Sequence, residues 1–454
     1  MAENTRLWIA NPLAIFTGNA EDAAGGLVIQ GTKILELVAK GQEPAGGWDE
    51  RYDASRQVLI PGLINTHHHF YQTLTRALPA ALNKELFPWL KTLYPVWAGL
   101  EPDMLSAATE LALTELLMSG CTTAADHHYL FPAALEEAVD IQVEAAAKVG
   151  MRVTLTRGSM SLGEDQGGLP PQSVVQTEAA ILADSERLVQ RYHDASEGSM
   201  VQIALAPCSP FSVTTELMRD TATLAKQYNV RTHTHLAETL DEEAFCEQQF
   251  GLRTVDYLDS VGWLNERSWL AHGIHFNDEE IARLGSAGVG IAHCPSSNMM
   301  LASGICQVQA LEDAGCPVGI AVDGSASNDC SNMIQEVRQA MYLQRLRYGS
   351  SKVHHQHALR WGTRGSAAVL GRDDVGELAV GKQADIVLFG LDELRFSGAH
   401  DPLAALLLCG AHQADAVMVG GRWRVMDGQP LNIDIPALIE KHQAAAQRLA
   451  AKVG

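Results

Sequence analysis

The chain has 454 residues, of which 46% are hydrophobic and 19% are charged, an ordinary globular composition. Its formal net charge of -21 opposes binding to nucleic-acid phosphates and to anionic membrane surfaces. No apolar run approaches the roughly 18 residues of a membrane span, and residues 1–8 lack the basic and apolar pattern of a secretion signal. The eight cysteines are scattered without a CxxC pair, so neither a disulfide framework nor a thiolate zinc site is indicated. We expect a cytoplasmic protein without nucleic-acid or membrane partners.

The two ends of the chain share one pattern. Short β-rich runs alternate with Gly, Asn and Asp over residues 6–58, which predicts an antiparallel sheet module, and similar runs return from about Gly376. The length exceeds the roughly 250–300 residues that one core usually supports. We therefore expect residues 1–59 and 376–454 to form one small β-sandwich domain, with a terminal helix over 435–452.

Between these ends, apolar runs alternate with amphipathic segments. Helices are expected over 102–119 and 133–148, each followed by a strand-like run, CTTAAD and RVTLTRGS. The later strand-like runs are VQIALAPC, RTHTHLAE, SWLAHGIH, VGIAHCPSSN and PVGIAVDGS. With a first strand at Ile64, the eight strand-helix units predict an α/β fold, a (β/α)8 TIM barrel over residues 60–375. A doubly wound open sheet is the alternative, but no GxGxxG motif opens its first helix.

The stretch LIPGLINTHHHF, residues 59–70, ends in three consecutive histidines. If it continues as a strand, His67 and His69 share one face and His68 points to the other. Polar side chains also end the other predicted strands, where barrel enzymes carry their active sites: Asp126, His127, His128, Arg157, Cys208, His235, Glu238, His272, His293 and Asp323. Because buried unpaired charges are costly, a bound metal would satisfy several of these groups at once.

His67, His69 and His235 would supply three neutral nitrogen ligands, and Asp323, on the strand that neighbours the first in a closed barrel, would complete the set. Three histidines and one carboxylate suit a catalytic zinc, with ferrous iron as the alternative. A second metal would need a bridging carboxylate, such as a carbamylated lysine at the end of strand four. That strand ends in ALAPCSPF, so we expect one divalent metal in each chain.

The motifs PGLINTHHH, THLAE, LAHG, HCPSSN and VDGSASND follow one another in this order. On these motifs the chain resembles the amidohydrolase superfamily over nearly its whole length, in the branch of guanine, cytosine and triazine deaminases. HHHFYQTLTRA, LYPVW and HCPSSNMMLASGI look most like the 8-oxoguanine deaminase group, also labelled hydroxydechloroatrazine ethylaminohydrolase-like. The resemblance implies conversion of 8-oxoguanine to urate plus ammonia. A guanine deaminase or an s-triazine amino- or chlorohydrolase is the alternative.

The resemblance also implies the catalytic roles. Asp323 would accept the proton of the attacking water and pass it to ammonia, and Glu238 would protonate a ring nitrogen. His272 would stabilise the tetrahedral intermediate through a hydrogen bond. The alternative for Glu238 is a solvated carboxylate at the start of the next helix. A noncatalytic scaffold of the same fold is a rival from another class, but such proteins generally lose metal ligands that this chain keeps.

The expected partner is a small aminopurine or related N-heterocycle, bound by a homo-oligomer. Gln72 would donate to a purine carbonyl, while Trp97 and Tyr129, together with Trp89, would stack on a flat ring. Arg157 would contact a carbonyl or form a structural pair with a carboxylate. Cys208 and Asn298 complete the expected substrate-binding residues.

Overall fold

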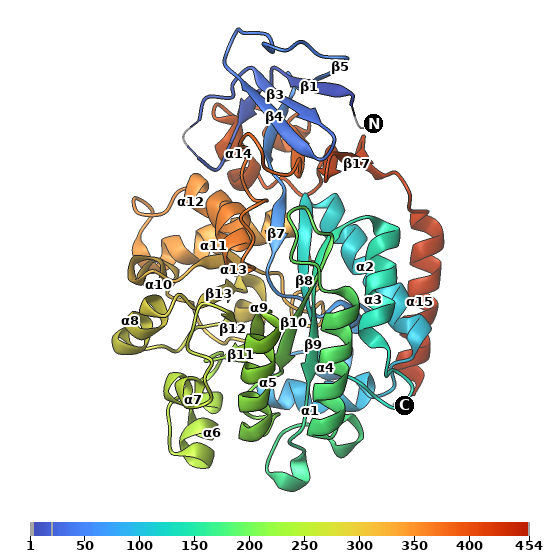
Figure 1. The fold of residues 1–454 in the computed structure, drawn as a ribbon, viewed down its shortest axis with the longest axis vertical. Coiled ribbons are helices and arrows are strands. Elements are labelled where there is room, and N and C mark those ends of the chain that lie inside the picture. The colour runs from blue at the N-terminus through green and yellow to red at the C-terminus, as the bar shows by residue number, and fades with distance from the viewer. Residues whose placement is uncertain (1–3, 20, 453–454) are drawn as a thin grey trace.

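A ring of eight parallel strands lies at the centre of the computed structural model, which describes residues 4–19 and 21–452 (Figure 1). In chain order these are β7 (Leu63–Asn65), β8 (Cys121–His128), β9 (Arg152–Ser159), β10 (Val201–Pro207), β11 (Thr232–Leu236), β12 (Ser268–His272), β13 (Gly290–His293) and β14 (Val318–Ile320). Each strand pairs with the next, and the Thr66 backbone N–H donates to the Ile320 carbonyl at 3.1 Å across the remaining gap. The predicted TIM barrel is confirmed.

Helices surround the barrel, as the alternating pattern predicted (Figure 1). They include α2 (Pro102–Met118), α3 (Ala138–Val149), α4 (Glu178–Tyr192), α5 (Thr215–Tyr228), α6 (Leu240–Phe250), α7 (Thr254–Ser260), α8 (Asp278–Ser286), α10 (Val308–Ala314) and α11 (Met333–Tyr348). Local signals set their ends: the Thr214 side chain caps α5, and Asn277 and Glu280 form a capping box on α8. Helix α3 begins five residues later than expected, because a turn in which the Leu135 N–H donates to the Pro132 carbonyl precedes it.

Two further sheets lie at one end of the barrel (Figure 1). The four-stranded sheet contains β1 (Arg6–Ala10), β3 (Gly26–Gln30), β4 (Lys33–Val38) and β5 (Glu50–Asp53). The six-stranded sheet contains β2 (Ala14–Ile15), β6 (Gln57–Pro61), β15 (Ile386–Gly390), β16 (Ala416–Val419), β17 (Arg422–Met426) and β18 (Gln429–Pro430). Because β6 pairs with β15, the two ends of the chain meet in one sheet.

An apolar core that includes Ile9, Leu27, Leu59 and Ile386 joins these two sheets. The expected division between residues 59 and 60 falls inside β6. The expectation of a purely antiparallel module is wrong, because β1 pairs with β5, and β2 with β6, in parallel. Residues 39–49 carry the chain from β4 to the far side of β1 instead of turning back.

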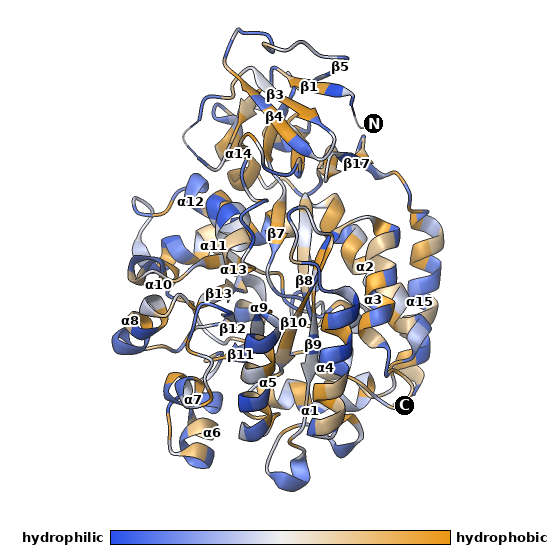
Figure 2. Ribbon diagram, viewed as in Figure 1, coloured by the Kyte–Doolittle hydropathy of each residue, from blue (hydrophilic) through white to orange (hydrophobic). Residues whose placement is uncertain are grey.

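The terminal helix α15 (Ile435–Ala451) runs along α2 on the outside of the barrel (Figure 1). Figure 2 shows apolar residues on the strands of the small sheets and hydrophilic residues on outer helices such as α8 and α12 (His355–Arg360). Among the described residues, no helix is both long enough and apolar enough to cross a membrane.

Candidate metal centre and catalytic site

Three histidines follow β7, which ends at Asn65, in an extended segment beyond the strand. The alternation predicted for a strand continues through this segment. His67 and His69 turn towards His235, whereas His68 accepts a 2.7 Å hydrogen bond from the His69 backbone N–H and its ring packs against Phe70. His68 is therefore excluded from the histidine cluster by the direction of its side chain.

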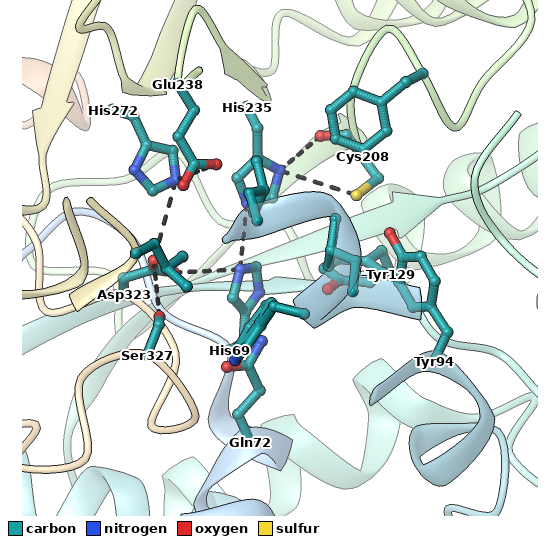
Figure 3. Close-up of a pocket in the computed structure, with 15 residues that line it drawn as sticks. His69, Gln72, Tyr94, Tyr129, Cys208, His235, Glu238, His272, Asp323 and Ser327 are labelled. Atoms are coloured by element: carbon teal, nitrogen blue, oxygen red, sulfur yellow. Dashed lines mark hydrogen bonds and ion pairs between the residues drawn. The ribbon is translucent and has the colours of Figure 1, made fainter. Parts of the chain in front are cut away.

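The four predicted metal ligands converge at the carboxyl ends of β7, β11 and β14. Figure 3 shows three of them, His69, His235 and Asp323. The Nε2 atoms of His69 and His235 are 3.2 Å apart, and Asp323 Oδ1 lies 3.2 Å from His67 Nε2 and 3.4 Å from His69 Nε2. Ligand atoms that are each 2.0–2.1 Å from a tetrahedral zinc lie about 3.3 Å from one another. The spacing of these side chains fits such an ion.

The hydrogen bonds at the opposite side of each ring show which nitrogen is free to bind a metal. His69 Nδ1 and His235 Nδ1 each lie 2.7 Å from a backbone carbonyl oxygen, that of His127 and of Cys208. Because a carbonyl can only accept, each Nδ1 carries the proton, and the neutral ring keeps a lone pair on Nε2. Burial lowers the pKa of His235 to about 3, which keeps this ring neutral.

Electron pairs therefore face one another in the centre of the cluster without a proton between them. His67 Nε2 is buried and has no hydrogen-bond partner, although it lies 3.2 Å from the Asp323 carboxylate. Facing acceptors repel unless a cation lies between them. The chemistry of this donor set thus fits a divalent metal held by His67, His69, His235 and Asp323.

Two further titratable groups lie beside this cluster. Glu238 is 3% exposed, and its Oε2 lies 3.4 Å from His272 Nε2, while Oε1 accepts a 3.2 Å hydrogen bond from the Ser303 hydroxyl. Burial raises the pKa of Glu238, which suits a carboxyl group that carries a proton. His272 Nδ1 lies 2.9 Å from the side-chain carboxamide of Asn298, and this contact orients the ring with Nε2 towards Glu238 and Asp323.

The backbone is strained where these groups leave their strands. Ala237, His272 and Asp323 are non-glycine residues with positive φ angles of 54°, 73° and 61°. Such conformations cost of order 1–3 kcal/mol each and cluster at functional sites. Here they redirect the chain at the ends of β11, β12 and β14, next to the side chains that form the cluster.

A cavity opens over the cluster, and the atom-free space there, part of it open to solvent, is about 390 Å³. One wall is apolar and comes largely from α1 (Leu86–Trp97), with Leu86, Trp89, Leu90 and Tyr94, together with Phe211 and Leu301. The polar lining consists of Gln72, Tyr129, Cys208 and Ser327, in addition to His69, His235, Glu238, His272 and Asp323 (Figure 3). A flat heterocycle would thus lie between an aromatic wall and the titratable groups.

The predicted substrate-binding residues divide between this cavity and its surroundings. Gln72, Tyr129 and Cys208 line it, whereas Asn298 lies behind His272 as its hydrogen-bond partner. Burial raises the pKa of the Cys208 thiol to about 12, so the group remains neutral and unreactive.

Trp97 and Arg157 do not line the cavity. The Trp97 indole N–H donates to Thr75 Oγ1 at 3.1 Å within the core. Arg157 forms a 2.6 Å ion pair with Asp184, and its guanidinium lies 3.6 Å from the centre of the Phe131 ring. Of the two alternatives for Arg157, a contact with a substrate carbonyl or a structural pair with a carboxylate, this arrangement matches the structural pair.

Sequence reasoning missed Tyr94, Leu90 and Ser327 as lining residues. A signal for the first two exists, because residues 86, 90 and 94 are spaced by four and share one face of α1. Nothing in the sequence pattern shows that this face covers the mouth of the barrel.

Comparison with known proteins identifies the family of the chain. The model of the amidohydrolase family matches residues 58–424. The 8-oxoguanine deaminase of Pseudomonas aeruginosa is 67% identical over 447 residues, which are 98% of this chain and 100% of the relative. The hydroxydechloroatrazine ethylaminohydrolase of Pseudomonas sp. is 36% identical over 460 residues, covering 95% of this chain and 94% of that protein.

Among solved structures, an atrazine chlorohydrolase from Arthrobacter aurescens complexed with zinc superimposes with a TM-score of 0.90. It is 31% identical, and the match covers 97% of this chain and 99% of that chain. The resemblance drawn from the sequence motifs is confirmed, and the chain belongs to the amidohydrolase family.

Proposed function

We propose that this chain is an aminohydrolase that uses one zinc ion to convert 8-oxoguanine and water into urate and ammonia. The observation that carries the proposal is the position of Glu238 and Asp323 on either side of His272 Nε2, at 3.4 and 4.0 Å, beneath one cavity. In this arrangement one carboxyl group would face a bound ring, while the other lies within the ligand cluster. Two carboxyl groups in different environments can carry opposite proton-transfer roles.

His67, His69, His235 and Asp323 would hold the ion, with ferrous iron as the alternative to zinc. When bound, the ion would act as a Lewis acid and make water nucleophilic near neutral pH. The zinc present in the atrazine chlorohydrolase structure supports the choice of metal.

Asp323 would act as the base towards water. Its Oδ1 accepts a 2.7 Å hydrogen bond from the Gly324 backbone N–H, and its Oδ2 accepts one from the Ser327 hydroxyl at 3.3 Å. These bonds orient the carboxylate to take a proton from the attacking water. The same proton would then pass to the amino group as it leaves as ammonia.

Glu238 would act as the acid towards the ring. A protonated Glu238 would give its proton to the ring nitrogen beside the amino-bearing carbon while the water oxygen bonds to that carbon. The His272 imidazole would donate a hydrogen bond to the oxygen and stabilise its negative charge. The carbon–nitrogen bond to the amino group then breaks and ammonia leaves, while the remaining hydroxyl proton passes to Glu238, which forms a carbonyl in the ring and restores the protonated acid.

The choice of 8-oxoguanine depends on the relative that is 67% identical along the whole chain. Trp89, Tyr94 and Tyr129 offer aromatic surface to a purine, and the Gln72 carboxamide offers hydrogen bonds to its edge. The matches to triazine-acting relatives keep a triazine hydrolase, alongside guanine deaminase, as the alternative.

A substrate panel tests the proposal. The metal-loaded protein is assayed for ammonia release from 8-oxoguanine, guanine, isocytosine, cytosine and hydroxytriazines. We expect the highest kcat/KM with 8-oxoguanine. A higher value with guanine or a triazine would select the corresponding alternative, and no turnover of any compound would favour the noncatalytic scaffold.

A further inference from the structure

The three histidines of the metal cluster are oriented by two kinds of hydrogen-bond partner. His69 Nδ1 and His235 Nδ1 donate to backbone carbonyls. His67 Nδ1 instead lies 2.7 Å from Nε2 of a side chain, that of His233. Of these three ligands, His67 alone has no backbone carbonyl at its Nδ1 and depends on a side-chain nitrogen instead, so this contact can be changed by mutation.

The position of His233 determines which atom carries the proton. His233 Nδ1 lies 2.8 Å from the Trp269 carbonyl oxygen, so it must donate there. A neutral His233 then has only a lone pair on Nε2, which accepts the proton on His67 Nδ1. In the opposite arrangement His233 would donate from both ring nitrogens and would therefore be a positively charged imidazolium. Burying this charge among other imidazoles, with no carboxylate bonded to His233, is costly. His67 is thus held in the tautomer whose Nε2 is free for the metal.

The surroundings of His233 prevent it from turning away. Its ring stacks on the Trp269 indole with centroids 4.2 Å apart and planes inclined by 11°. Trp269 is itself fixed, because its indole N–H donates to the Thr66 carbonyl at 3.1 Å, directly before His67 in the chain. His233 and Trp269 are 1% and 0% exposed, so no solvent is available to replace these contacts.

His233 does not fit the role of a further ligand. Its nitrogens lie near those of His67 and His127, but the 2.7 Å contact between His233 Nε2 and His67 Nδ1 is shorter than the separation of about 3.3 Å between tetrahedral ligands. Its other nitrogen is already used by the Trp269 carbonyl.

We propose that His233 is a positioning residue that fixes the tautomer and ring orientation of His67 and thereby sets the affinity of the site for its metal. The inference rests on the metal centre of the proposed function, and it goes further in assigning a role to a residue outside the ligand set. Partners of this kind typically contribute 10–100-fold to metal affinity.

The test compares zinc affinities of three variants of the full chain with that of the unmodified protein. His233→Met removes the acceptor at similar volume, whereas His233→Gln keeps an acceptor near the position of Nε2. His128→Met is the matched control, because His128 is equally buried and its Nε2 donates to the Leu130 carbonyl at 2.7 Å, outside the cluster. Metal-free proteins are titrated with zinc against a chromophoric chelator, without substrate.

We expect His233→Met to weaken zinc binding by roughly 10–100-fold, with His233→Gln and His128→Met within about threefold of the unmodified protein. Unchanged affinity of His233→Met would overturn the inference, and so would an equal loss in His233→Gln, which would show a packing role only. An equal loss in His128→Met would overturn it as well. If the unmodified protein binds no zinc or iron, the proposed metal centre itself fails.

Discussion

The Nε2 atoms of His69 and His235 lie 3.2 Å apart, although 166 positions separate the two residues in the chain. The barrel produces this contact because β7 and β11 present their carboxyl ends to the same face. Their Nδ1 protons are both bound by carbonyl oxygens of neighbouring strand ends, at His127 and Cys208. The fold thus fixes both the positions and the tautomers of these rings.

The three consecutive histidines allow a sharp test of the ligand set. His67→Ala or His69→Ala should abolish both metal binding and activity, because each removes an Nε2 next to Asp323. His68→Ala should retain metal and most activity, with a lower Tm because the side chain is fully buried. Metal analysis of the purified proteins, together with ammonia release, checks this. Loss of metal from a folded His68→Ala protein would contradict the assignment.

Glu238→Gln should retain metal and fold while kcat falls by roughly 10²–10⁴-fold, since the carboxamide cannot transfer a proton to the ring. Glu242→Gln is the matched control. Glu242 lies four residues later, and its carboxyl accepts a 2.9 Å hydrogen bond from the Glu238 backbone N–H, which a carboxamide can also accept. Equal losses in the two variants would argue against Glu238 as the acid.

Glu242 also gives a prediction for stability. Burial raises its pKa from 4.5 to about 8. Between these values the unfolded chain has released the proton and the folded chain has not, so the free energy of unfolding falls as pH rises from about 4.5 to 8. The unfolding free energy of Glu242→Gln minus that of the unmodified protein should therefore increase by at least about 1 kcal/mol when the pH is raised from 5 to 8.5.

Urea denaturation at the two pH values measures this gain. Asp241→Asn is the control, because Asp241 is exposed on the same helix and should show no comparable change. A difference between Glu242→Gln and the unmodified protein that is independent of pH would show that the carboxyl group ionises normally.

Because Trp89 lines the cavity and Trp97 lies in the core, we expect substitution of Trp89 to weaken substrate binding and substitution of Trp97 to lower the stability of the fold. Trp89→Leu should raise KM for a purine by roughly 5- to 150-fold, because stacking on an aromatic ring contributes about 1–3 kcal/mol per base. Trp97→Phe should lower Tm with little change in KM, since the Trp97 indole bonds to Thr75 in the core. Steady-state kinetics and thermal denaturation distinguish the two, and a larger change of KM in Trp97→Phe would contradict the placement of these residues.

Much of the site could be predicted from the sequence because its residues are adjacent to recognisable strands. The alternation of His67, His68 and His69 follows from local geometry alone, whereas the role of Glu238, three residues after His235, is what the family resemblance implies. The roles of Trp97, Arg157 and Asn298 depend instead on which helix or loop lies over a given strand end. The parallel pairing of β1 with β5 likewise depends on a crossover that has no local signal.

The most direct test is a titration of metal-free protein with zinc while the conversion of 8-oxoguanine to urate and ammonia is followed. The proposed function predicts that activity rises linearly and reaches a plateau at one zinc per chain, with one ammonia released for each urate formed. Absence of urate at every zinc level, or a plateau at two ions per chain, would contradict it.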